Sequence, residues 1–188
     1  VQKTKLAAIE AEWHTEPAPA AFTLFGIPNQ KEMRTDYAIK IPYVMGIIAT
    51  RSTDKEVTGL HDLMKAHEIR IRNGMVAYSE LTKLRAGDQS PELLASFEKN
   101  QKDLGYGLLL KKYTPNVVDA TEEHIKAATK DTIPNVAALF FSFRAMVASG
   151  ALMLLLFLLA AWSVAKRNAE TKPWLLKFAL FALPLPWI

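Results

Sequence analysis

The stretch AMVASGALMLLLFLLAAWSVA, residues 145–165, decides the fold, because its 21 residues contain no charged side chain. At about 1.5 Å of rise per residue it makes a helix of roughly 30 Å, which matches the hydrocarbon core of a bilayer. The sequence therefore predicts a membrane-spanning helix that begins near Pro134 and ends near Val164. Arg144 and Met146 place a cation and a thioether at the edge of this apolar run.

The net charge of +4 comes entirely from basic residues around the apolar segments. Residues 1–132 contain 18 Lys or Arg and 18 Asp or Glu, so the pI of about 9.2 does not indicate a nucleic-acid-binding protein. The linker 166–173 carries a net charge of +2, and short basic linkers tend to stay in the cytoplasm. We therefore expect residues 1–132 to lie on the outer side of the membrane.

The apolar segment 174–188 has 15 residues and would reach only about 22 Å as a helix, too short to cross a bilayer. Because the chain lacks an initiating methionine and stops inside this segment, we expect a fragment of a larger membrane protein. Its polar, charged start is not a signal peptide. The absence of cysteine excludes disulfides and cysteine-held zinc or iron–sulfur clusters.

Hydrophobic spacing and helix-start residues predict four helices before the apolar run. Their ranges are about 3–13, 60–85, 91–104 and 122–130, with Ser90 and Thr121 as N-caps and a break at residues 105–107. Residues 17–59 contain four prolines and lack a clean hydrophobic period. They predict a loop that packs against another part of the protein.

The predicted fold class is therefore all-α, a fragment of a multi-pass transmembrane helical protein with a long outer loop of helices and irregular links. The expected boundaries are an outer region over 1–132, a spanning helix over 133–165, a cytoplasmic linker over 166–173 and the start of a second span over 174–188.

Arg144 and Met146 are the candidate functional residues of the spanning helix. A charge beside the hydrocarbon costs about 2.5–3.5 kcal/mol on insertion and suggests a function, but an arginine at the edge can also extend into the interface. A methionine can be an axial ligand to haem iron, although most methionines in apolar helices only pack. The two side chains lie about 200° apart around a helix, so a shared role needs a large ligand.

Lys5 and Glu10 lie on the predicted N-terminal helix. Their five-residue offset separates them by about 140°, so no salt bridge along the helix is expected, and an ordinary solvated face is the simpler interpretation of spacing alone. The four histidines are scattered through residues 1–132 without an HExxH motif, which argues against a helical zinc site.

Several longer motifs in a fixed order resemble subunit I of the cytochrome bd-type quinol oxidases, and the resemblance covers the whole chain. The motifs are KLAAIEAEW (5–13), PAPAAFTLFGIP (17–28), IIATR (47–51), RIRNG (70–74), DLGYGLLLK (103–111), YTPN (113–116), FRAM (143–146) and PLPWI (184–188).

This resemblance implies that residues 1–132 are the quinol-binding "Q loop" on the periplasmic side of a bacterial inner membrane. The stretch from about 60 to 130 resembles the extension of the long-loop subfamily. The resemblance places quinol-site roles on Lys5 and Glu10 and a quinone-contacting aromatic ring on Phe22. It also makes Met146 an axial ligand to low-spin haem b, with Arg144 as a functionally important neighbour.

The resemblance further implies that the histidine ligand of this haem lies upstream of Val1, and that the ligands of the high-spin haem b and haem d lie outside the chain. The implied partners are ubiquinol or menaquinol, oxidase subunit II, small accessory subunits and the lipid bilayer, with no nucleic acid. The implied reaction is quinol oxidation coupled to oxygen reduction.

Quinol is expected to enter from the membrane, with Glu10 as general base and Lys5 stabilising charge on the opposite ring oxygen. The fragment alone is expected to be inactive. The competing interpretation is a non-enzymatic membrane-anchored scaffold, in which the outer helices recruit a partner and the apolar helices only tether it.

Overall fold

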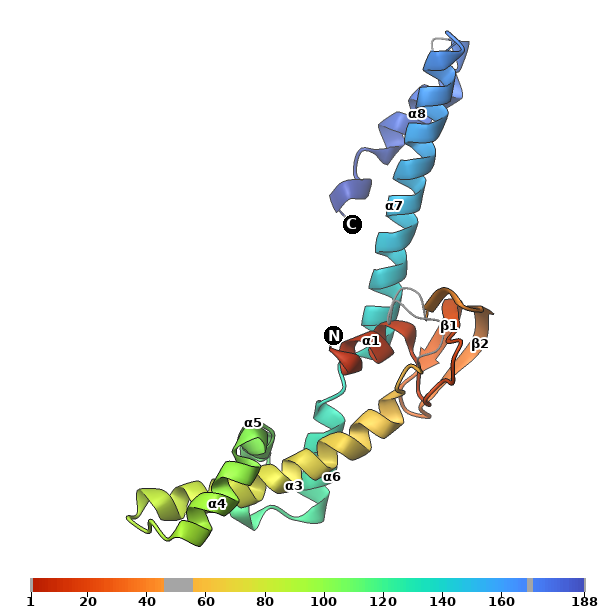
Figure 1. The fold of residues 1–188 in the computed structure, drawn as a ribbon. Helices are drawn as coiled ribbons and strands as arrows, with labels where there is room; N and C mark the ends of the chain where they lie inside the picture. Colours follow the sequence, from red (N-terminus) through yellow and green to blue (C-terminus); the bar gives the residue numbers. More distant parts are fainter. Residues whose placement is uncertain (1, 46–55, 169–170, 188) are drawn as a thin grey trace. The chain divides into compact units, whose positions relative to one another are not determined.

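The computed structural model describes residues 2–45, 56–168 and 171–187, so the motif at residues 47–51 lies outside the described part. The chain forms two units, Val1–Ala137 and Ala138–Ile188 (Figure 1). The first unit combines a short helix, a β-hairpin and a group of helices. The second consists mainly of apolar helices.

The N-terminal helix α1, Lys3–Glu10, is shorter than the predicted range of 3–13. It ends at Glu10 because Ala11 adopts a left-handed conformation with φ of 50°, and its N–H turns back to the carbonyl of Ala8 at 3.2 Å. Trp13 therefore lies outside the helix, and its indole N–H donates to the hydroxyl of Thr35 at 3.0 Å. The chain leaves α1 directly toward the hairpin.

An antiparallel hairpin of β1, Phe22–Asn29, and β2, Arg34–Ile41, occupies part of the segment predicted to be a loop (Figure 1). The side-chain oxygen of Asn29 accepts the N–H groups of Lys31 and Glu32 at 3.2 Å each, which stabilises the turn. The described part of the chain is mostly helical, as predicted, but the all-α expectation is wrong here. Register shifts within β1 interrupt the two-residue period that would have revealed a strand.

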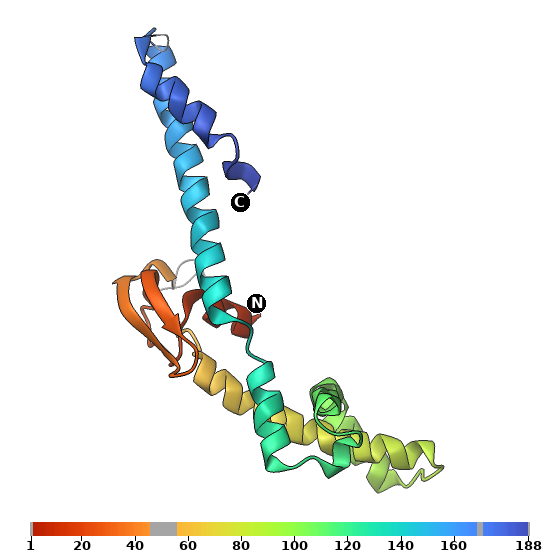
Figure 2. The same cartoon turned by 180° about the vertical axis from the view of Figure 1, so that it is seen from behind.

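The helix α3, Leu60–Arg85, matches the predicted range of 60–85 and is the longest element of the first unit. Shorter helices lie beside it, as Figures 1 and 2 both show. These are α4, Pro91–Asn100, α5, Leu104–Gly107, and α6, Glu122–Asp131, with the 3-10 turns η1, Gln101–Asp103, η2, Leu108–Lys112, and η3, Val117–Asp119, along the connections.

Two predicted N-caps have different outcomes. Thr121 caps α6 in a capping box, in which its hydroxyl accepts the N–H of His124 and the His124 ring accepts the N–H of Thr121. Ser90 precedes α4 with Pro91 at the first helical position, but its side chain makes no capping hydrogen bond. The predicted helix over 91–104 ends at Asn100, where a 3-10 turn begins.

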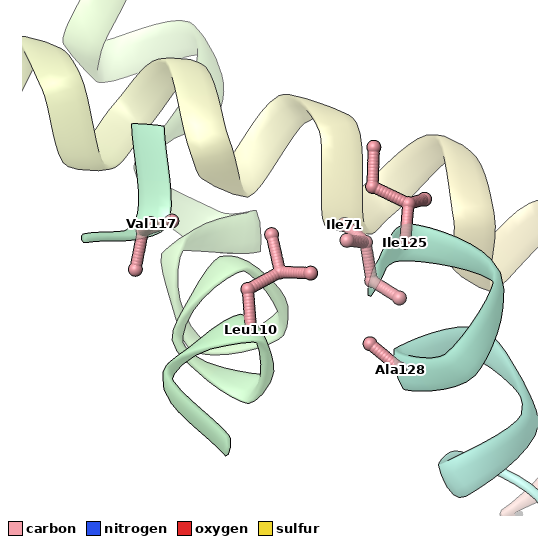
Figure 3. Close-up of a cluster of buried hydrophobic side chains, with 5 residues drawn as sticks. All are labelled: Ile71, Leu110, Val117, Ile125 and Ala128. Carbon is pink, nitrogen blue, oxygen red and sulfur yellow. The ribbon is translucent and has the colours of Figure 1, made fainter. Parts of the chain in front are cut away.

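A cluster of buried aliphatic side chains joins these helices (Figure 3). Its members come from α3, η2, η3 and α6 and are Ile71, Leu110, Val117, Ile125 and Ala128. Fully burying one large aliphatic side chain contributes about 1.5–3 kcal/mol. Because the members come from segments up to 57 positions apart, from residue 71 to residue 128, this cluster holds the region together.

Gly74 of α3 and Gly107 of α5 bring the backbones of these helices into close contact. A Cβ atom on Gly107 would lie 2.4 Å from the carbonyl carbon of Gly74, and one on Gly74 would lie 2.3 Å from the amide nitrogen of Gly107. The predicted break at residues 105–107 is therefore wrong, because these residues lie within α5 and Gly107 serves close packing.

Substituting Gly107→Ala in the complete protein is expected to lower the free energy of unfolding by about 3 kcal/mol, because both backbones would have to separate. Gly105→Ala is the matched control, since nothing lies within 4 Å of its added Cβ. Alanine favours helix over glycine by about 1 kcal/mol, so this control should not destabilise. Thermal unfolding of the purified protein measures both, and equal midpoints would contradict the packing role.

An ion pair between Arg70 of α3 and Asp103 of η1 adds to this packing. The Arg70 Nε–H donates to Asp103 at 2.6 Å, and the Asn73 amide donates to its second oxygen at 3.2 Å. Asp103 is 3% exposed. Burial acts to raise the pKa of Asp103, but the hydrogen bonds from Arg70 and Asn73 outweigh it, so the pKa is lowered.

Because the folded-state pKa of Asp103 is depressed, the pair stabilises the fold above the unfolded pKa of about 3.9. This contribution should be lost as the pH falls below about 4. Arg70→Gln should lower the free energy of unfolding at pH 7 by about 2 kcal/mol, less than for a fully buried pair. Arg72→Gln, which breaks exposed pairs with Glu68 and Glu122, is the control and should cost under about 1 kcal/mol. If thermal unfolding shows similar losses of stability in Arg70→Gln and Arg72→Gln, the result would argue against a special role for Asp103.

The helix α7, Val136–Ala165, has 30 residues and contains the apolar run. In the described part of the chain it is the one helix long and apolar enough to cross a membrane. Its apolar window has a mean hydropathy of 2.2, and only 6% of that window is buried. The predicted long apolar helix is therefore confirmed, whereas its crossing of a membrane stays a prediction. Beyond it, α8, Pro173–Ala182, has 10 residues, so the second span stays a prediction.

Candidate functional site

Glu10 is the last residue of α1 and its side chain is buried, with 2% of the residue exposed. Its carboxylate accepts the backbone N–H of Thr23 at 3.2 Å. Thr23 follows Phe22, the first residue of β1, which is 9% exposed. The structure thus brings the segments of two predicted site residues, Glu10 and Phe22, together through one hydrogen bond.

Lys5 lies on the exposed side of α1, about 140° around the helix from Glu10. The structure therefore places Lys5 and Glu10 on one short helix but in different surroundings.

Two carboxylates and one ammonium form a cluster that the sequence did not reveal. The Lys40 Nζ atom lies 3.0 Å from an oxygen of Glu12 and 3.0 Å from an oxygen of Glu16. Glu12 and Glu16 follow α1, whereas Lys40 lies in β2, so the contact forms where β2 folds onto the segment after α1. The only signal in the sequence was that this lysine lies between apolar residues in a stretch of strand-forming residues. We call these three residues the carboxylate–lysine cluster.

Electrostatics distinguishes Glu12 within this cluster. Burial raises the pKa of Glu12 and outweighs the opposing hydrogen bond from Lys40. Burial also acts to lower the pKa of Lys40, but its hydrogen bonds with Glu12 and Glu16 outweigh this effect and leave the pKa raised. Lys40 therefore stays charged at neutral pH and holds both carboxylates.

A hollow of about 180 Å³ lies beside the carboxylate–lysine cluster. Thr23, Glu12 and Lys40 line it together with residues of both strands and of the segment after α1. The same Thr23 whose N–H binds Glu10 thus borders the hollow.

Gln30, at the end of the hairpin turn nearest β1, binds the chain where α7 begins. Its amide donates to the carbonyl of Pro134 at 3.3 Å, and its amide oxygen accepts the N–H of Val136 at 3.1 Å. Val136 is the first residue of α7, whose first N–H groups have no partner within the helix. Gln30 therefore caps this helix from 106 positions away.

Arg144 and Met146 lie in the second unit, on α7. The Arg144 guanidinium lies 3.3 Å from the centre of the Phe140 ring and donates to the Phe140 carbonyl at 3.1 Å, so it extends toward the N-terminal end of the helix. The Met146 side chain is 54% exposed. Its thioether is accessible to a ligand, and Arg144 lies half a turn from it along the helix.

The four histidines have structural partners in the described chain. The His67 ring binds the hydroxyls of Thr132, at 2.9 Å, and Thr4, at 3.4 Å, and burial together with the charge of Arg70 lowers its pKa. His14 and His61 lie against each other, and His124 belongs to the α6 cap. Within the described ranges no group of three His, Cys, Asp or Glu residues could hold a metal ion.

The described chain thus combines a region rich in ion pairs with one long apolar helix that has the length and composition to cross a membrane, as in a membrane protein. The family model for cytochrome bd terminal oxidase subunit I matches residues 1–188. The chain belongs to this family.

Two curated relatives show how the chain compares with members of the family. It is 43% identical to cytochrome bd-II ubiquinol oxidase subunit 1 of Escherichia coli (strain K12) over 188 residues, which are 100% of this chain and 37% of the relative. It is 23% identical over 187 residues to cytochrome bd ubiquinol oxidase subunit 1 of Bacillus subtilis (strain 168), covering 28% of that protein. The chain thus spans about a third of the length of these relatives.

Proposed function

We propose that the chain is part of the quinol-oxidising, haem-binding subunit of a bd-type respiratory terminal oxidase. In this role it transfers electrons from quinol through low-spin haem b toward oxygen and contributes to the proton motive force. The observation that carries the proposal is the burial of Glu10 at the end of α1, bonded to the strand that begins with Phe22. Both relatives are named ubiquinol oxidase subunits, which supports quinol as the substrate.

The proposed topology places residues 1–132 on the periplasmic side as the Q loop. Residues 133–165 cross the inner membrane, 166–173 form a cytoplasmic linker and 174–188 begin the next span. The positive charge of the linker supports this orientation. At its end, α7 carries Trp162 with the Lys166 ammonium 4.5 Å from the ring centre, a pair suited to a membrane interface.

Glu10 acts in this proposal as the base that accepts a hydroxyl proton of quinol. Its carboxylate is buried at the end of α1, and a base shielded from bulk water suits a proton transfer from a bound substrate. Lys5 binds the opposite ring oxygen and stabilises negative charge that develops there. Phe22 contacts the quinone ring through its aromatic side chain.

Met146 would hold low-spin haem b through its thioether, a ligand type that haem iron accepts, from its exposed position on an apolar helix. When bound, the haem supplies the acceptor for one electron at a time. Arg144 provides positive charge beside it, which offsets the charge of haem propionates. Since α7 contains no histidine, a histidine that would hold the haem together with Met146 would come from another part of the complete protein.

A reduced-minus-oxidised spectrum of the purified complete protein, together with quinol-dependent oxygen uptake, tests this function. We expect haem b bands and oxygen uptake that depends on added quinol. A protein without haem bands and without uptake would contradict the proposal. That result would favour the alternative, a membrane-anchored scaffold with an outer helical interaction region.

A further inference from the structure

We propose that Lys40 is a positioning residue for the quinol site. By binding Glu12 and Glu16, it holds the start of β1 against the end of α1 and so fixes Phe22 and Thr23 relative to Glu10. The inference rests on the proposed function, in which Glu10 and Phe22 contact quinol. It adds a residue outside the proposed site, 30 positions from Glu10 in the sequence.

The register of the hairpin links Lys40 directly to this site. Lys40 lies opposite Thr23, and Ile41 lies opposite Phe22. Paired residues of an antiparallel ladder move together, because their backbones are hydrogen-bonded to each other or to adjacent pairs. A displacement of β2 at Lys40 therefore displaces Thr23, whose N–H binds the Glu10 carboxylate.

The two carboxylates bind Lys40 to segments that are themselves fixed. The Glu12 N–H donates to the carbonyl of Ala7 at 2.9 Å, so the base of this side chain belongs to the end of α1. The second oxygen of Glu16 accepts the N–H of Ala21, the residue before β1, at 3.2 Å. The carboxylate–lysine cluster therefore joins the end of α1, the approach to β1 and the strand β2.

A second set of contacts between the hairpin and the segment after α1 lies nearer the turn. The Thr35 hydroxyl donates to the carbonyl of Ala11 at 2.9 Å and accepts the indole N–H of Trp13 at 3.0 Å. Between these contacts and the cluster lies the hollow of about 180 Å³, where packing is incomplete. Neutral bonds thus hold the hairpin near its turn, whereas Lys40 holds the end of β2 that pairs with Thr23.

Charge explains why Lys40 matters more than either carboxylate. Glu12 and Glu16 share one ammonium, and the other charged groups lining the hollow are Arg34 and the titratable ring of His14. Without Lys40 the two carboxylates would lie close together and repel each other. Removal of Glu16 alone would leave the Lys40–Glu12 ion pair in place.

The test uses Lys40→Met in the complete enzyme, which removes the charge and keeps most of the side chain's volume. We expect kcat/KM for quinol to fall about tenfold, mainly through a lower kcat, because a shift of the reacting groups near 1 Å can cost up to about a hundredfold. The haem spectrum should not change. Lys40→Arg should retain most of the activity, and Glu16→Gln should give a smaller loss than Lys40→Met.

The matched control is Arg34→Gln, which removes a basic residue from the same strand. Arg34 pairs with exposed Glu32 and Asp36 near the turn, so its loss should leave kcat/KM unchanged. An unchanged kcat/KM in Lys40→Met, with impaired Glu10→Gln, would overturn the role of Lys40 and leave the proposed function standing. Normal turnover in Glu10→Gln would instead overturn the proposed role of Glu10.

A double variant separates positioning from a general loss of folded protein. If Lys40 acts through the placement of Thr23 and Glu10, Lys40→Met should have little further effect on kcat/KM in the Glu10→Gln background. A full tenfold loss in that background would show that Lys40 acts independently of Glu10 and would overturn the inference.

Discussion

Replacing Met146 with leucine in the complete protein is expected to abolish the low-spin haem b signal while the protein still assembles. Leucine and methionine have similar volumes, so packing on the apolar surface of α7 should be kept within about 1.5 kcal/mol. Leucine lacks the sulfur lone pair that would bind iron. The reduced-minus-oxidised spectrum should therefore lose its low-spin component, and quinol oxidase activity should fall with it.

Met153 provides the control for this substitution. It lies seven residues further along α7, about two turns deeper and on nearly the same side of the helix. Met153→Leu makes the same chemical change about 10 Å away and should leave the haem spectrum intact. A normal low-spin signal in Met146→Leu would contradict axial ligation by this residue.

Glu10→Gln should impair quinol oxidation by at least about a hundredfold, the usual contribution of a general base. Glutamine keeps the size of the side chain and an oxygen that can accept the Thr23 N–H, but its amide cannot take up a proton at neutral pH. Because this variant keeps Met146, the residue proposed to hold the haem, the haem spectrum should be unchanged. Steady-state oxygen uptake with added quinol measures the loss.

Two controls accompany this prediction. Glu123→Gln makes the same change at an exposed position of α6 and should not affect turnover. Lys5→Ala should lower kcat/KM, whereas Lys3→Ala, also exposed on α1, should leave it unchanged. Wild-type turnover in both Glu10→Gln and Lys5→Ala would remove the roles proposed for these residues.

Helices with strong local signals were predictable from the sequence. The bounds of α3 follow from apolar residues at helical spacing, and α7 follows from the absence of charge over 21 residues. The hairpin was missed because irregular pairing of β1 with β2, with two register shifts, interrupts the alternation of apolar residues. The role of Gly107 was missed because close packing against Gly74 depends on tertiary contact.

The site could be predicted only through resemblance. Spacing on one helix favoured a solvated face for Glu10, yet the structure buries it against Thr23, 13 residues away. That burial depends on the left-handed residue Ala11 and on the hairpin, neither of which has a clear local signature. Lys40 was not singled out, because its partners lie 28 and 24 positions away and meet it only when β2 folds onto the segment after α1.

The central claim is that residues around Glu10 deliver electrons from quinol to a haem held by Met146. Anaerobic stopped-flow absorption of haem b reduction tests it most directly, with wild-type and Glu10→Gln enzymes each mixed with quinol or with dithionite. We predict that Glu10→Gln slows reduction by quinol at least about a hundredfold and leaves reduction by dithionite unchanged. Reduction by quinol at the wild-type rate in Glu10→Gln would contradict the claim.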